Sequence, residues 1–174
     1  MPCYLTYHAY GTWLPNRKQG YVKRGRGILP TSDHMHRLYS TAMKEDVVAF
    51  DERSQRQAIE TLLSSQTLQQ FELHFVATEA THIHSLLAWR GDRESKKLRS
   101  LIKTSLSKAF NVAFHRRSWF AEGGSRKQVR DREHYDYLVN VYLPKHSGWK
   151  WSRARGLFKE GCSTTLSRRA RPSG

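Results

Sequence analysis

Three segments of the chain carry the apolar patterning of β-strands. The first, Tyr4–Trp13, alternates between two faces, and its aromatic side chains could stack on nucleic-acid bases. The second and third, Phe71–Ala77 and Thr81–Trp89, are separated by a turn short enough to join them as an antiparallel hairpin. Thr81–Trp89 is therefore predicted to be an inner strand. Alternation in the first strand places a set of polar and aromatic side chains on one face: Tyr4, Thr6, His8 and Tyr10.

Three other segments repeat apolar residues at helical spacing. Asp51–Gln70 has one apolar stripe, and Glu94–Phe114 combines an apolar face with basic residues on its other faces. The third, Arg132–Leu143, repeats Tyr and aliphatic residues three and four positions apart. Strands and helices in this order predict an α/β (α+β) fold. We expect a central antiparallel sheet of ferredoxin-like or RRM-like type with helices on one face.

Two segments lack any such period and are rich in basic residues. Pro15–Ser32, which also contains three glycines, predicts a basic loop. Residues 152–174 are polar and basic, and we expect a flexible tail there. The 174-residue length suits one domain with its own core, which we place at residues 1–151.

The charge balance indicates a polyanionic partner. Lys and Arg number 30 against 15 Asp and Glu, which gives a formal charge of +15 and a pI near 10.2. A membrane is the weaker alternative, because the sequence has neither the apolar run of about 18 residues that a spanning helix needs nor a signal peptide. Cys3 and Cys162 form neither a disulfide framework nor a zinc motif, which favours a reducing cytoplasm. The residues expected to contact DNA phosphates are Lys96, Lys97, Arg99, Lys103, Lys108 and Arg126.

His82 and His84 are the strongest candidates for metal ligands. In a strand they project from the same side about 6.6 Å apart, a spacing that can hold one cation, while Ile83 faces the other way. Two hydrogen-bonded or solvent-facing histidines would show the same pattern. A second copy, His34-Met35-His36, has no apolar strand around it and predicts a loop or the start of a helix.

The last predicted helix supplies a candidate nucleophile. Tyr142 ends a stripe that begins at Tyr135 and must face the sheet, so its side chain is expected to point inward. Tyr137 lies off that stripe, on the face that carries Val141. Tyr142 could equally be the aromatic end of an amphipathic helix.

From Tyr4 to Trp151 these features resemble, in order, the single-tyrosine HUH transposases, particularly the REP-associated tyrosine transposase branch. The resemblance rests on the aromatic first strand, the His-hydrophobic-His strand, the basic helix and the final helix with its tyrosine. Three shorter matches add to it: Gly11-Thr-Trp-Leu-Pro15, Trp119 and Gly123-Gly-Ser-Arg126. The chain departs from the family in having Glu79-Ala-Thr81 where Met-Pro-Asn is common.

The resemblance implies roles for four residues. His82 and His84 would bind a divalent metal, Mg²⁺ or Mn²⁺, and Tyr142 would be the nucleophile. His146, four residues later, would complete the metal site, whereas Tyr137 would put Val141 there, which cannot bind a cation. Pro144 disfavours a helical turn before it, so the helix is expected to end near Tyr142 and His146 to reach the metal from a turn.

The function that this resemblance implies is cleavage and rejoining of hairpin-bearing single-stranded DNA through a 5′-phosphotyrosine, with a free 3′-OH. Family members occur as dimers and as monomers, and the sequence leaves both open. Two other functions remain compatible with the residues. One is a domesticated, non-catalytic nucleic-acid-binding protein of the same fold, and the other is a metal-dependent nuclease that uses water as the nucleophile.

Overall fold

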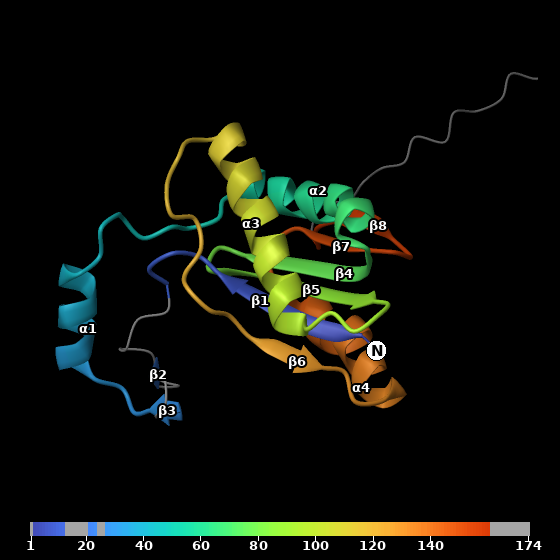
Figure 1. Ribbon diagram of the computed structural model, residues 1–174, viewed down its shortest axis with the longest axis horizontal. Helices are drawn as coiled ribbons and strands as arrows, with labels where there is room; N and C mark the ends of the chain where they lie inside the picture. Colours follow the sequence, from blue (N-terminus) through green and yellow to red (C-terminus); the bar gives the residue numbers. More distant parts are fainter. Residues whose placement is uncertain (1, 13–20, 24–26, 161–174) are drawn as a thin grey trace, which may run out of the picture.

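The computed structural model describes residues 2–12, 21–23 and 27–160, and its sheet confirms the predicted α+β class (Figure 1). The main sheet has six strands, all antiparallel to their neighbours, in the order β6-β1-β5-β4-β7-β8. Strand β5, which carries the histidine pair, lies between β1 and β4 and is an inner strand as predicted. The strands are β1 (Cys3–His8), β4 (Phe71–Glu79), β5 (His82–Trp89), β6 (Arg126–Gln128), β7 (Lys150–Ser152) and β8 (Gly156–Phe158).

The central part of the chain follows the ferredoxin-like βαββαβ order. Helix α2 (Glu52–Gln69) leads into β4 on the chain after β1, and helix α3 (Ser95–Ala113) connects β5 to β6. Local sequence defines both ends of α2. The side chain of Asp51 accepts a hydrogen bond from the Ser54 amide at 2.8 Å, and Gln70 ends the helix in the left-handed conformation. These caps set where α2 ends and β4 begins.

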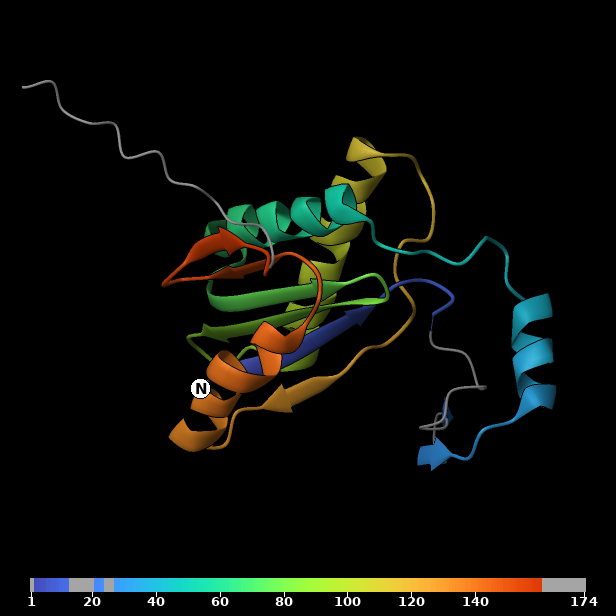
Figure 2. The same ribbon diagram turned by 180° about the vertical axis from the view of Figure 1, so that it is seen from behind.

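Helices cover both faces of the sheet, so the expectation of helices on one face is wrong in this respect. Helices α2 and α3 bury one face through a core that includes Leu5, Ile83 and Ile102. The last helical segment packs on the opposite face, where Leu138 and Leu143 lie against the sheet (Figure 2). That segment consists of α4 (Arg132–Tyr137), the π-helix η1 (Leu138–Tyr142) and the 3₁₀-helix η2 (Leu143–Lys145). Strand alternation therefore separates the face covered by α2 and α3 from the face that carries His84 and the last helical segment.

Part of the segment expected to be a basic loop forms two short paired strands, and residues 13–20 and 24–26 lie outside the described chain. Strands β2 (Tyr21–Lys23) and β3 (Gly27–Leu29) pair antiparallel, because Tyr, Val, Ile and Leu at these positions favour strand over irregular backbone. Trp13 lies outside the described residues. Helix α1 (Asp33–Thr41) follows with Ser32 as its N-cap, so the second His-Met-His copy starts a helix.

The sheet continues beyond Trp151. Strands β7 and β8 form an antiparallel hairpin next to β4, and Arg155 lies over the Phe158 ring at 3.9 Å. The first part of the segment expected to be a tail therefore belongs to the sheet, and residues 161–174 lie outside the described chain. Within the described chain, no helix is long and apolar enough to cross a membrane.

Gly148 fixes the turn that leads into β7, and replacing it should destabilise the fold. A Cβ there would lie 2.2 Å from the Thr78 carbonyl oxygen and 2.6 Å from Oε1 of Gln55. We expect Gly148→Ala to lower the free energy of unfolding by about 1–3 kcal/mol, measured by urea denaturation. The neighbouring, exposed Ser147→Ala is the matched control. Equal unfolding midpoints for the two variants would contradict this assignment.

Candidate metal and nucleophile site

Strand β5 brings His82 and His84 together on the face opposite α2 and α3. Their ring centroids are 4.4 Å apart. His84 is 5% exposed, whereas the side chain of His82 is 19% exposed. Ile83 between them is fully buried in the core under α2 and α3, as strand alternation predicts.

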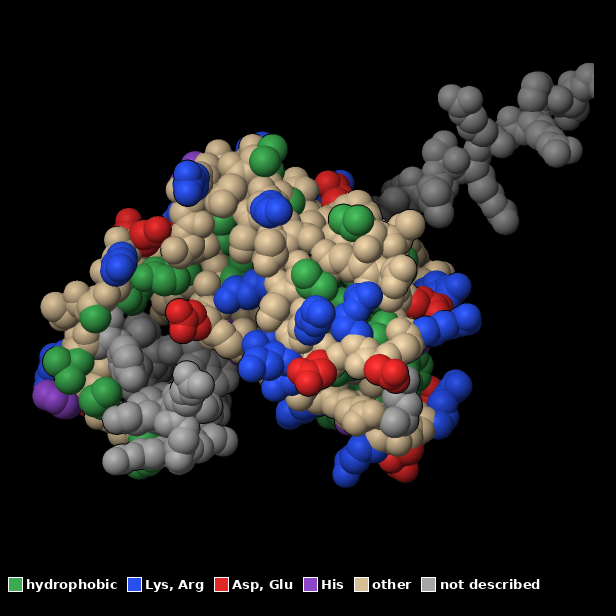
Figure 3. Space-filling view, in the orientation of Figure 1, with side chains coloured by type: hydrophobic (Ala, Val, Ile, Leu, Met, Phe, Trp, Pro, Cys, Tyr) green, Lys and Arg blue, Asp and Glu red, His purple; other side chains and the backbone are tan. Residues whose placement is uncertain are grey.

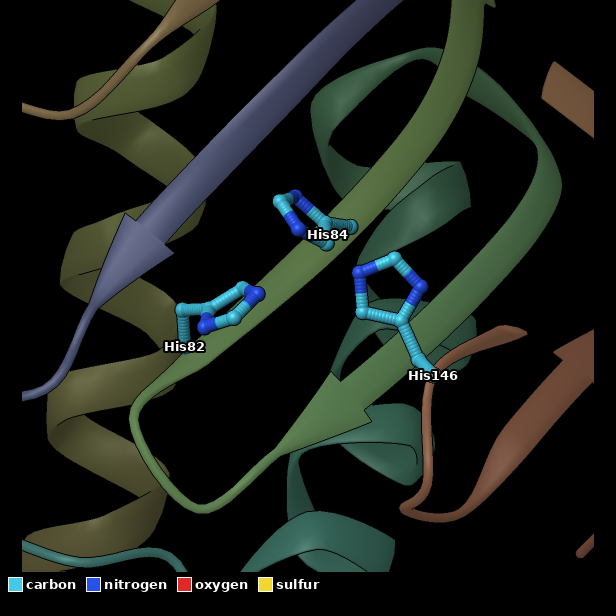
Figure 4. Close-up of side chains that lie close together, drawn as sticks. All are labelled: His82, His84 and His146. Atoms are coloured by element: carbon cyan, nitrogen blue, oxygen red, sulfur yellow. The ribbon is translucent and has the colours of Figure 1, made fainter. Parts of the chain in front are cut away.

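His146 joins this pair from the turn after η2. Pro144 lies at the start of η2, and the backbone becomes extended at His146 itself, with φ −66° and ψ 140°. The helical segment thus ends near Tyr142, and His146 comes from a turn as predicted. Its ring centroid is 4.6 Å from that of His84 and 5.6 Å from that of His82 (Figure 4).

The three histidines could hold one metal ion. One nitrogen from each ring lies within 4.8 Å of the others, and all three rings point toward a common centre (Figure 4). Nε2 of His84 is buried and has no hydrogen-bond partner in the described part of the chain. A buried nitrogen without a partner costs free energy unless something binds it, so this atom fits a metal ligand.

Hydrogen bonds at the other ring nitrogens orient the imidazoles. Nδ1 of His146 donates to the Leu143 carbonyl oxygen at 3.1 Å, which leaves the lone pair on Nε2. Nδ1 of His82 lies 2.8 Å from Oγ1 of Thr81. Nε2 of His82 lies 3.9 Å from a carboxylate oxygen of Glu79. This use of Nδ1 is typical of histidines that bind a metal through Nε2.

Burial keeps His84 neutral. Desolvation, followed by the neighbouring His82, His146 and His8, lowers the pKa of His84 to about 2. A neutral imidazole carries the lone pair that a cation requires, so His84 can act as a ligand across the physiological pH range.

Tyr142 lies beside the histidines. Its ring centroid is 5.3 Å from that of His146 and 6.1 Å from that of His84, and the residue is 37% exposed. It belongs to the π-helix η1, a rare wide turn that occurs frequently at functional sites. Tyr137 is 50% exposed, and its ring centroid lies 6.4 Å from that of Tyr142. Tyr142 is therefore both close to the histidines and open to a substrate.

Strand β1 contributes three site residues that the sequence analysis did not assign to the site. The register places Thr6 opposite His84 and His8 opposite His82. Tyr4 stacks on the His84 ring, with centroids 4.9 Å apart, and its hydroxyl lies 2.6 Å from Nδ1 of His84. Burial raises the pKa of Tyr4 far above its usual value, and an interaction with the Tyr142 hydroxyl raises it further. The alternation of polar and aromatic residues in this strand was visible in the sequence. The register that brings the strand beside β5 was not.

Lys150 is a buried cation on the same face of the sheet. It pairs with Ala77, which in turn pairs with His84, so the three residues form one row across the strands. Its ammonium group donates to the His146 carbonyl oxygen at 2.5 Å, and burial lowers its pKa. Lys150 therefore anchors the backbone of the turn that carries His146.

The six residues expected to contact DNA lie away from this site. Five are on α3, on the other side of the sheet, and several Lys and Arg side chains gather on this face in Figure 3. Arg99 donates to the Gly124 carbonyl oxygen and Lys103 to that of Ala121, so both tie the following segment to the helix. Arg126, on β6, donates to Oγ of Ser95 at 3.3 Å. Four of the six are exposed: Lys96, Lys97, Lys108 and Arg126.

Trp119 belongs to the core. The residue is 7% exposed, and its indole nitrogen donates to Oδ1 of Asn111 at 3.0 Å. Its low exposure and its hydrogen bond indicate that Trp119 packs in the core and is not a platform for stacking bases.

Comparisons with known proteins identify a structural neighbour but no family. No protein-family profile matches the sequence, and no curated protein matches it. A solved structure of a REP-associated tyrosine transposase bound to a REP hairpin matches with a TM-score of 0.48 and 12% sequence identity. The match covers 82% of this chain and 64% of that one, so the chain spans less than two thirds of its neighbour.

Proposed function

We propose that the protein is a metal-dependent tyrosine transposase or endonuclease that cleaves and rejoins hairpin-bearing single-stranded DNA. The observation that carries this proposal is a cluster in which three histidines and a tyrosine lie side by side. Three imidazoles have ligand atoms within 4.8 Å of one another, and a partly exposed tyrosine ring lies 5.3 Å from one of them. A metal site and a phenol side by side suit attack on a phosphodiester.

His82, His84 and His146 would hold the divalent metal. Three neutral nitrogens leave other coordination positions for water and for a phosphate oxygen, which suits Mn²⁺ or a Mg²⁺ that keeps several waters. A bound divalent cation would neutralise charge on the scissile phosphate and orient it for in-line displacement. The buried Nε2 of His84, with no protein partner in the described chain, supports this ligand set.

Tyr142 would supply the nucleophile. Its phenolic oxygen forms a bond to phosphorus while the bond from phosphorus to the 3′-oxygen breaks, and the phenolic proton ends on that 3′-oxygen. The products are a 5′-phosphotyrosine and a free 3′-OH. Because one phosphodiester replaces another, the reaction can reverse and rejoin strands without ATP. The 37% exposure of Tyr142 leaves it accessible to DNA.

The net charge of +15 would supply most of the DNA affinity through phosphate contacts. We expect binding of a single-stranded hairpin to weaken with salt, with a log–log slope of about −0.7 for each phosphate neutralised. Lys97→Ala should reduce that slope by about 0.7, measured by fluorescence anisotropy at several salt concentrations. A salt-insensitive complex would contradict the assignment of α3 and β6 as a phosphate-binding surface.

Hairpin DNA labelled on either side of the cleavage position tests the proposed function. After incubation with Mn²⁺, denaturing electrophoresis should show one labelled strand shifted to the mass of a protein–DNA adduct. Cleavage without an adduct would indicate a nuclease that uses water, and binding without cleavage would indicate a non-catalytic protein. Either result would overturn the proposal.

A further inference from the structure

We infer that Tyr4 is a positioning residue that connects the His84 imidazole to Tyr142 and aligns both for their roles. The inference rests on the proposed function, which supplies the roles of metal ligand and nucleophile. Tyr4 is 6% exposed and lies between the two residues. Its ring stacks on the His84 ring, with centroids 4.9 Å apart, and meets the Tyr142 ring edge-on, with centroids 5.9 Å apart.

The two nitrogens of His84 have unequal surroundings. Nε2 is buried without a partner in the described chain, whereas Nδ1 faces two hydroxyl groups from β1. Tyr4 Oη lies 2.6 Å from Nδ1 and Thr6 Oγ1 lies 2.9 Å from it. If Nε2 is to bind a cation it must carry the lone pair, so Nδ1 must carry the hydrogen and donate it to one of these oxygens. The shorter distance assigns Tyr4 as the main acceptor.

This direction of donation releases the hydroxyl hydrogen of Tyr4 for another acceptor. The side chains of Tyr142 and Thr6 both interact with the Tyr4 hydroxyl, and the Tyr142 ring meets the Tyr4 ring edge-on with centroids 5.9 Å apart. The chain of donation then runs from His84 Nδ1 to Tyr4 Oη and from Tyr4 to the Tyr142 oxygen. A phenol oxygen that accepts one hydrogen bond keeps a second lone pair for attack on phosphorus. Tyr4 would thereby place the attacking oxygen relative to the metal ligand.

Thr6 serves as a comparison within the same strand. Its hydroxyl contacts Nδ1 of His84, as the Tyr4 hydroxyl does. Tyr4 differs from Thr6 in having a ring that contacts the Tyr142 ring. The Thr6 side chain also interacts with the Tyr4 hydroxyl. Removing the Thr6 hydroxyl should therefore change the surroundings of the imidazole and of Tyr4 but keep the contact between Tyr4 and Tyr142, whereas removing the Tyr4 hydroxyl should affect both the imidazole and the nucleophile. The two substitutions separate the two connections.

Tyr7→Phe is the matched control. Tyr7 belongs to β1, is 1% exposed and faces the core under α2 and α3, so its substitution removes the same atom on the other side of the sheet. Tyr4→Phe and Tyr7→Phe both keep the aromatic ring. Thermal unfolding of the metal-free proteins shows whether each variant retains the fold.

The first measurement is Mn²⁺ affinity without DNA, followed by the electron paramagnetic resonance signal of free Mn²⁺. Losing a hydrogen-bond partner of a metal ligand typically weakens the metal site by about 10–100-fold. We expect Tyr4→Phe to weaken Mn²⁺ binding by at least about tenfold, Thr6→Val to weaken it less, and Tyr7→Phe to leave it unchanged. Wild-type affinity in Tyr4→Phe would overturn the connection to His84.

The second measurement is the rate of adduct formation at saturating Mn²⁺. Thr6→Val should regain the wild-type rate once the metal site is filled, whereas Tyr4→Phe should stay at least about tenfold slower because its contact with the Tyr142 hydroxyl is lost. Full recovery in Tyr4→Phe would overturn the connection to Tyr142. A wild-type protein that binds Mn²⁺ but forms no adduct would overturn the proposed function while the affinity measurement still tests the connection to His84.

Discussion

Tyr142→Phe is expected to eliminate the covalent protein–DNA adduct, with the rate of its formation falling by more than about a thousandfold. The substitution removes the oxygen that would bond to phosphorus and keeps the ring that packs against Tyr4 and His146. The fold, the Mn²⁺ affinity and the affinity for the hairpin should therefore persist. Denaturing electrophoresis of labelled hairpin DNA measures the adduct, and anisotropy measures binding.

Tyr137→Phe is the control for this prediction. Tyr137 lies one helical turn earlier, is more exposed than Tyr142 and contacts its ring, so it is the nearest alternative nucleophile on this segment. Its substitution should leave the adduct intact. Proteolysis of the adduct and mapping of the DNA-linked peptide identify the modified residue directly. A phosphotyrosine at position 137 would reverse the assignment.

Local periodicity was sufficient to predict strands β1, β4 and β5 and helices α2 and α3, but not the shorter strands. The hairpin of β4 and β5 followed from two apolar segments joined by a short turn, and α2 and α3 followed from helical spacing. The final segment was harder to predict. A stripe at helical spacing indicates that one side packs, but it does not indicate which face of the sheet receives it. A pattern based on 3.6 residues per turn also does not predict the π-helix η1, whose turns are wider.

Part of the candidate site depends on register, which a single sequence does not contain. Alternation placed His82 and His84 on one face of β5, and Pro144 placed His146 in a turn. Pairing of Thr6 with His84, and the stacking of Tyr4 on that ring, depend on how β1 aligns with β5. The buried Lys150 lies near the end of the expected domain, in a short segment with no strand pattern, and its place in the sheet depends on pairing with β4.

His84→Ala is expected to weaken Mn²⁺ binding by about 100-fold or more and to abolish adduct formation at micromolar Mn²⁺. His84 is the most buried of the three histidines, and its Nε2 is the atom with no partner in the described chain. His146→Ala should have a smaller effect, with activity partly restored by higher Mn²⁺, because two histidines on the rigid strand β5 remain. Hairpin affinity should hardly change in either variant, since Lys and Arg contacts with phosphates supply most of it.

The second His-Met-His copy provides the matched control for the metal site. His34→Ala and His36→Ala each remove an imidazole from α1, outside the cluster of ligand atoms, and should leave Mn²⁺ affinity and adduct formation unchanged. Comparing these variants with His84→Ala shows whether Mn²⁺ binding depends on this cluster or on any histidine of the chain. Equal Mn²⁺ affinity in His84→Ala and His34→Ala would mean that the three histidines do not hold the metal. The neutral, buried His84 imidazole would then be a packing residue, and cleavage would have to proceed without this ligand set.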